Sequence, residues 1–182
     1  MRGVAGAGGS AQRPRPNGRR ALAFDPIAEA SRHWRERFGE TGPMAAVTSI
    51  MRAQQILLGE IDGILRPFGL SFARYEALVL LMFSRRGSLP MSKMGERLMV
   101  HPTSVTNAVD RLEQDELVRR MAHPTDRRTT LVEITDEGRA RVERATTELM
   151  GVDFGLRGLD PAETARLTEL ITLLRQAAGD FT

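Results

Sequence analysis

The stretch LPMSKMGERLMVHPTSVTNAVDRLEQDELVRRMAHPTDRRTTLVEITDEG, residues 89–138, decides the fold. Its first part, residues 90–98, has the apolar spacing of a short helix. A second helix starts at His101, with a proline in the first helical position, where its missing N–H costs nothing. Only Met99-Val100 separates the two segments, so the sequence predicts two short helices joined by a tight turn.

Two brief strands follow the second helix, at residues 117–121 and 130–134, where β-branched and apolar residues alternate with polar ones. The turn between them, residues 123–128, is polar and basic. Two short helices followed by a hairpin with a basic tip predict a winged helix-turn-helix, in which one helix enters the major groove of DNA and the hairpin flanks it. Residues 85–128 carry nine basic and six acidic side chains, so any positive surface must come from their placement.

Helical spacing divides the second helix into two faces. Val105, Val109 and Leu112 form one apolar stripe that faces a core. The side chains left facing outward are those of Thr103, Ser104, Thr106, Asn107 and Arg111. These are residue types that hydrogen-bond to base edges and phosphates. The alternative is that they are caps and solvated surface, which is a common role of Ser, Thr and Asn near a helix start.

Helical patterns also surround this stretch. Amphipathic segments are predicted at 25–38, at 43–66 and from Ser71 to near Gly87. After the hairpin, one helix starts at Thr135-Asp136, and Asp160-Pro161-Ala162-Glu163 forms a capping box that starts the last helix. The fold class predicted is therefore mainly α with a small β-hairpin wing.

Composition limits the classes of protein that fit. The chain has 182 residues, 41% hydrophobic and 27% charged, which fits one soluble domain with tails. No apolar run reaches the roughly 20 residues that cross a bilayer, and the N-terminus lacks the apolar core of a secretory signal. We therefore expect a cytoplasmic protein with no membrane partner.

The first 22 residues are rich in Gly, Pro, Ala and Arg without apolar periodicity, so we expect a disordered basic tail. Five arginines and no acid lie within residues 1–20, whereas residues 21–182 carry 21 basic and 23 acidic side chains. Such an arm adds salt-dependent attraction to nucleic acid. An idle tail is the equally weighted alternative.

No enzyme motif is present. The chain has no cysteine, and His33, His101 and His123 lack the mutual spacing of a metal site, so neither a zinc site nor a thiol sensor is expected. It has no Gly-x-Ser-x-Gly, no phosphate-binding glycine loop followed by lysine and no His-Glu-x-x-His. We expect no enzyme and no cofactor.

The stretch 89–138 resembles the MarR family of bacterial winged-helix transcription factors. The most specific motifs are HPTSVTNAVDRLE and Asp126-Arg127-Arg128 followed by TTLVEIT, and weaker resemblance extends from about Phe24 to the C-terminus. The resemblance implies DNA contacts by Pro102, Ser104, Thr106, Asn107, Arg111, Asp126, Arg127 and Arg128. In this reading the first four face the major groove and Arg111 holds the backbone or braces the motif. Arg128 enters the minor groove, oriented by Asp126, with Arg127 near phosphate.

The resemblance also implies a homodimer formed through the terminal helices. It divides residues 23–182 into a DNA-binding lobe at about 71–137 and dimerisation helices at about 25–66 and 138–178. Glu116 departs from the family, which has glycine after the recognition helix in most members. Because that glycine supplies a left-handed helix end, we expect the helix to run on here.

One branch of the family has an extra N-terminal helix with a tryptophan, and the segment 25–38 with Trp34 resembles it. By position, Trp34, Glu76 and Arg120 match the ligand-binding residues of that branch, whereas Ala108 replaces its second arginine. The replacement favours an anionic metabolite such as citrate or trans-aconitate over urate. Core packing of Trp34, and a structural ion pair for Glu76 and Arg120, are the alternatives.

The resemblance thus predicts a ligand-responsive, dimeric regulator that represses transcription from a palindromic operator. The alternative from another class is a sequence-tolerant structural DNA-binding protein without a ligand. Discrimination between operator and random DNA separates the two, because specific binders typically show about 10³-fold or more.

Overall fold

The structure, a computed structural model, describes residues 21–126 and 128–182. Nearly all of the predicted basic tail, residues 1–20, and the wing residue Arg127 lie outside the described residues. The described residues form two compact units, one up to residue 63 and one from residue 64 to 182.

The first unit holds helix α1 (Pro26–Phe38) and most of helix α2 (Gly42–Leu65). The predicted start of α1 is confirmed, because the Asp25 carboxylate accepts a hydrogen bond from the backbone N–H of Ile27 at 2.9 Å and Pro26 fills the first position. None of the residues of α1 is buried. Its apolar side is therefore not covered within its own unit.

The second unit contains the predicted helix-turn-helix and wing, followed by two further helices. Its elements in order are η1 (Arg66–Phe68), α3 (Phe72–Met82), β1 (Ser88–Pro90), α4 (Met91–Leu98), α5 (Pro102–Gln114), β2 (Val118–Ala122), β3 (Thr130–Ile134), α6 (Asp136–Met150), η2 (Asp153–Gly155) and α7 (Pro161–Ala177). The fold class predicted, mainly α with a small wing, is confirmed. No helix among the described residues is long and apolar enough to cross a membrane.

The sheet has three antiparallel strands in the order β1-β3-β2, one more than predicted. Strand β1 is only three residues long, which is too short for an alternating pattern to mark it. It ends in Pro90, which has no N–H to donate. Helix α3 ends at Met82, earlier than expected, because a turn follows in which the Gly87 N–H donates to the Ser84 carbonyl at 3.1 Å. That turn leads directly into β1.

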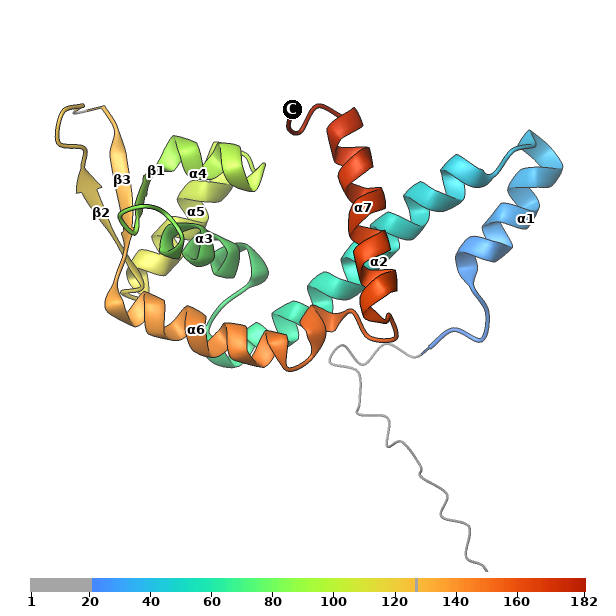
Figure 1. Ribbon diagram of the computed structural model, residues 1–182, viewed down its shortest axis with the longest axis horizontal. Coiled ribbons are helices and arrows are strands. Elements are labelled where there is room, and N and C mark those ends of the chain that lie inside the picture. Colours follow the sequence, from blue (N-terminus) through green and yellow to red (C-terminus); the bar gives the residue numbers. More distant parts are fainter. Residues whose placement is uncertain (1–20, 127) are drawn as a thin grey trace, which may run out of the picture. The chain divides into compact units, whose positions relative to one another are not determined.

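The core of the second unit lies where α3, α5 and α6 meet the sheet. Its most fully buried side chains include Leu78, Leu81, Met94, Leu117 and Val142, each with no exposed area. Figure 1 shows the β2–β3 hairpin projecting from this helical body. The helix-turn-helix is therefore anchored through its buried face, whereas the hairpin tip extends into solvent.

The expectation that α5 runs on past Glu116 is wrong. The helix ends at Gln114, and Glu116 itself adopts the left-handed conformation, with φ of 58°. The Leu117 N–H then donates to the Leu112 carbonyl at 2.8 Å, as in a glycine-terminated helix. Leu117 has no exposed area, so burial of its side chain, together with this bond, holds Glu116 in the strained conformation.

The helices after the hairpin begin as predicted. The Thr135 hydroxyl accepts a hydrogen bond from the Gly138 N–H at 3.0 Å, which caps α6. At α7, the side chain of each of Asp160 and Glu163 accepts from the other's backbone N–H at 2.8 Å, so the predicted capping box is present. No residue of α7 is buried.

Candidate nucleic-acid interface

Helix α5 is fixed at its start and along one face. The Nδ1 atom of His101 accepts a hydrogen bond from the Thr103 N–H at 3.2 Å and so replaces the usual Ser or Asp cap. Val105, Val109 and Leu112 are buried, as their spacing predicts. The burial of this stripe therefore fixes the rotation of the helix about its axis and keeps the opposite face toward solvent.

The five predicted α5 contacts, Pro102, Ser104, Thr106, Asn107 and Arg111, are all exposed. The Thr106 hydroxyl donates to the Pro102 carbonyl at 3.1 Å, and its oxygen can still accept a hydrogen bond. Asn107 makes no side-chain hydrogen bond and Arg111 no ion pair with any described residue. An amide and a guanidinium without partners on an exposed helix face are donors available to bases and phosphates.

The wing tip is ordered by its own side chains. Asp126 accepts from the Thr129 hydroxyl at 2.7 Å and from the Arg128 backbone N–H at 3.0 Å. These two bonds, the Thr129 bond first, lower the pKa of the Asp126 carboxyl. Asp126 thus holds Arg128 through the backbone and leaves its exposed guanidinium free of ion pairs with described residues. Arg127 lies outside the described residues.

Arg120, on β2, is engaged by two carboxylates of α5. Its Nη2 donates to Asp110 at 2.5 Å, its Nη1 donates to Glu113, and its backbone N–H donates to Glu113 at 3.0 Å. Burial works against the charge of Arg120, but the bonds to Asp110 and Glu113 outweigh it, so its pKa is raised. Sequence reasoning missed both carboxylates, although two acids three residues apart on α5, followed by an arginine after the turn, were a usable signal.

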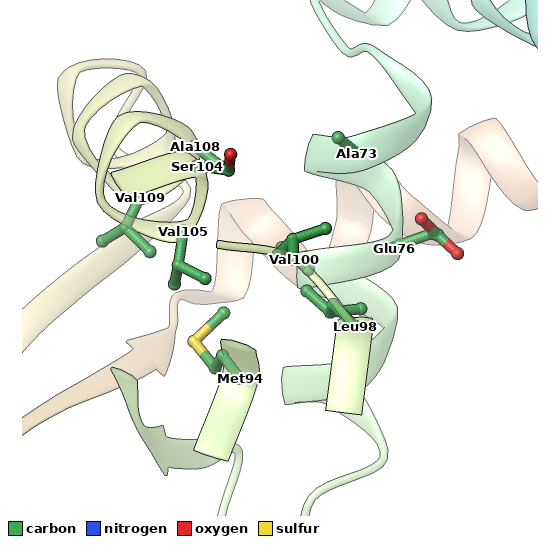
Figure 2. Close-up of a pocket in the computed structure, with 10 residues that line it drawn as sticks. Ala73, Glu76, Met94, Leu98, Val100, Ser104, Val105, Ala108 and Val109 are labelled. Atoms are coloured by element: carbon green, nitrogen blue, oxygen red, sulfur yellow. The ribbon is translucent and has the colours of Figure 1, made fainter. Parts of the chain in front are cut away.

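A small pocket of about 50 Å³ lies between α3 and the α4–α5 pair (Figure 2). Its lining is Ala73, Glu76, Ala77, Met94, Leu98, Val100, Ser104, Val105, Ala108 and Val109. Glu76 is the one charged residue among them, and its carboxylate points away from Val105 and Met94. Desolvation raises the pKa of Glu76. Ser104 lies on both surfaces, because it is exposed on α5 and lines this pocket.

The structure does not pair Glu76 with Arg120, so the alternative interpretation of these two residues as an ion pair is wrong. Glu76 makes no ion pair with a described residue, and Arg120 is taken by Asp110 and Glu113. Trp34 belongs to the other unit, where its ring lies 4.8 Å from that of Phe38, centroid to centroid, and stays 39% exposed. Within its own unit Trp34 therefore does not pack in a core.

Comparison with known proteins agrees with this geometry. The model of the MarR family matches residues 73–130. The HTH-type transcriptional regulator YhbI of Bacillus subtilis is 32% identical over 123 residues, which are 67% of this chain and 74% of YhbI. The family-model match includes α5, β2 and the turn of the wing up to the first residue of β3.

Two solved structures from Streptomyces coelicolor are similar. The MarR family regulator Sco5413 is 59% identical with a TM-score of 0.73, covering 78% of this chain and 99% of Sco5413. Sco3205, solved in complex with DNA, is 25% identical with a TM-score of 0.69, covering 78% of this chain and 90% of Sco3205. This chain therefore belongs to the MarR family, and it is a DNA-binding transcriptional regulator rather than an enzyme.

Proposed function

We propose that the protein is a homodimeric repressor that binds a palindromic operator and releases it when a small anionic metabolite binds. The observation that carries the DNA-reading part is the exposed face of α5, where Asn107 and Arg111 have no partner among the described residues and lie opposite a buried stripe. In the proposal, α5 enters the major groove and Arg128 enters the adjacent minor groove. Two copies then read two half-sites related by a twofold axis.

The eight proposed DNA contacts divide by role. Asn107 and Ser104 read base edges, together with Thr106 and Pro102, whereas Arg111 and Arg127 contact the backbone. Arg128 reads the narrow minor groove, with Asp126 fixing its position on the turn. The Sco3205 complex supports this proposal, because that relative was solved bound to DNA.

The test is a fluorescence-anisotropy titration of a palindromic operator against a scrambled duplex at fixed salt. We expect at least about 10³-fold preference for the operator in the wild type. Asn107→Ala should lower operator affinity more than scrambled-DNA affinity, because base contacts specify and phosphate contacts only position. Arg128→Ala should weaken operator binding by about 1 to 3 kcal/mol. Equal affinity of the wild type for both duplexes would instead identify a sequence-tolerant DNA-binding protein.

The ligand-binding part of the proposal involves Trp34, Glu76 and Arg120. Arginine offers a planar pair of donors to a carboxylate, so citrate or trans-aconitate suits Arg120, and urate is less suited because Ala108 supplies no second guanidinium. Since Asp110 and Glu113 already hold Arg120, an anion must compete with them, and success would loosen α5 from β2. A ligand that prefers the loosened state lowers operator affinity.

Trp34 is the one tryptophan of the chain, which makes its fluorescence a direct probe. Millimolar citrate, trans-aconitate or urate should change Trp34 emission and release operator, whereas sodium sulfate at matched ionic strength should not. Unchanged emission and unchanged operator affinity with all three compounds would refute the ligand proposal and leave the DNA-binding proposal standing.

A further inference from the structure

Arg120 occupies the junction between the two proposed DNA-reading elements. The connection from α5 to β2 is only residues 115–117, and it turns through the left-handed Glu116. At the base of the hairpin, Val118 and Ile134 are paired across the strands and buried. Further out, β3 stays paired with β1 as far as Leu131, and Val132, the cross-strand partner of Arg120, is buried, so the sheet holds β3. The angle of β2 to α5 then depends on what holds β2 itself against the helix.

The Arg120 side chain supplies that hold. It lies two residues beyond Val118 on β2 and reaches back to Asp110 and Glu113, one turn apart on α5. Glu113 also accepts the backbone N–H of Arg120 at 3.0 Å, so strand and side chain are fixed by the same carboxylate. Two charge-assisted bonds from a partly buried guanidinium, and a third from the backbone N–H of the same residue, define a rigid joint, because the planar fork allows few alternative geometries.

The neighbouring arginine provides a contrast. Arg119 pairs with Glu133, its direct cross-strand partner on β3, and its side chain is 66% exposed. That ion pair joins the two strands of the hairpin and does not involve α5. Of these two adjacent arginines, Arg119 therefore joins the two strands of the wing, whereas Arg120 joins the wing to α5.

We propose that Arg120 is a positioning residue for DNA recognition: its bonds to Asp110 and Glu113 set the angle between α5 and the wing, so that Arg128 reaches the minor groove while α5 occupies the major groove. The inference rests on the proposed function. It assigns to Arg120 a role in the ligand-free protein, where it acts through Arg128 and touches no DNA itself. Loss of Arg120 should therefore abolish the benefit of Arg128 without abolishing the reading by α5.

The experiment is a double-mutant cycle on operator affinity, with Arg120→Gln and Arg128→Ala alone and combined. We expect about a tenfold loss for each single variant and no further loss for the double variant, because a displaced wing has no minor-groove contact left to remove. Arg119→Gln combined with Arg128→Ala is the matched control, and its losses should multiply. Multiplying losses in the Arg120 cycle would overturn the inference.

A second readout separates positioning from general destabilisation. The wild type should prefer A·T-rich over G·C-rich DNA at the position of the wing, since a narrow minor groove attracts arginine. Arg120→Gln should lose this preference and keep the preference for the central operator bases, whereas Arg120→Lys, which retains one bond, should recover part of it. Full flank preference in both Arg120 variants would refute the inference.

If Arg120→Gln does not fold, Glu113→Gln serves in its place, because it weakens the same joint from α5. A wild-type protein that does not distinguish operator from scrambled DNA would overturn the proposed function before any variant is measured. Failure of the inference alone would leave wild-type operator preference intact.

Discussion

Helices α5 and α7 begin in the same way but differ in how far their apolar faces are buried. Both have proline in the first position and a side-chain cap, yet α5 buries its apolar stripe, whereas α7 buries no residue and leaves four leucines 40 to 60% exposed. These leucines are Leu167, Leu170, Leu173 and Leu174. The winged-helix region therefore completes its own core, whereas the leucines of α7 have no apolar cover within their unit. A second copy of the chain is the partner we propose.

The largest expected effect comes from charging the uncovered helix. Leu170→Glu should convert the dimer to a monomer and lower operator affinity by more than about 100-fold, since an unpaired charge buried in an interface costs several kcal/mol. Sedimentation velocity and operator anisotropy measure the two quantities. Gln176→Glu, on the same helix but at a polar position, is the control. A dimeric Leu170→Glu variant would break the comparison.

A smaller effect is expected in the core of the winged-helix region, at Gly138 in the first turn of α6. A Cβ there would lie 2.2 Å from the Leu117 carbonyl oxygen, which is backbone and cannot move aside easily. Gly138→Ala should destabilise the protein by about 1 to 3 kcal/mol, measured by denaturant unfolding. Gly151→Ala, where the nearest atoms stand at 3.5 Å, should change stability by less than about 1 kcal/mol. Equal effects of the two substitutions would show that the core tolerates the extra atom.

The next prediction concerns the junction between α5 and the wing, where a substitution should stabilise the protein. Glu116 is left-handed at φ of 58°, a conformation that costs a residue with a Cβ about 1 kcal/mol relative to glycine. Glu116→Gly should therefore stabilise the protein by about that amount, seen as a rise in Tm. Glu116→Ala keeps the Cβ and should show no such gain. A gain with alanine would assign the effect to the lost carboxylate instead of the backbone.

Glu116 also shows where sequence reasoning stopped. Helix starts were predictable, because Asp25, Thr135 and Asp160 act locally through their own side chains. The buried stripe of α5 followed from its period, and so did its exposed face. The end of α5 did not, because the buried position of Leu117 overrides the local preference of Glu116. Strand β1 was missed for a related reason, since its three residues are recognisable only through their pairing with β3.

The candidate site divides in the same way. Positions on α5 and the wing were predictable from one helix period and one turn, but their individual roles remain proposals. The sequence shows Asp110 and Glu113 as an acidic pair on α5, but the geometry of their bonds to Arg120 depends on how β2 folds back along that helix. For the same reason the sequence did not predict that Ser104 lines the pocket beside α3 while remaining exposed.

The smallest expected effect concerns Glu76, the charged residue at the edge of the pocket, whose side chain is exposed. Desolvation raises the pKa of its carboxyl above the value in the unfolded chain, so the folded protein binds the proton more tightly. Across the pH range in which this carboxyl titrates, the folded state then holds more protons than the unfolded state, and the free energy of unfolding falls as the pH rises. Glu76→Gln removes the titrating group, so its stability advantage over the wild type should grow across this range. Urea unfolding at several pH values measures the difference, and Glu148→Gln, on the exposed surface of α6, controls for the loss of one negative charge. An advantage that stays constant with pH would mean that desolvation does not perturb the Glu76 carboxyl.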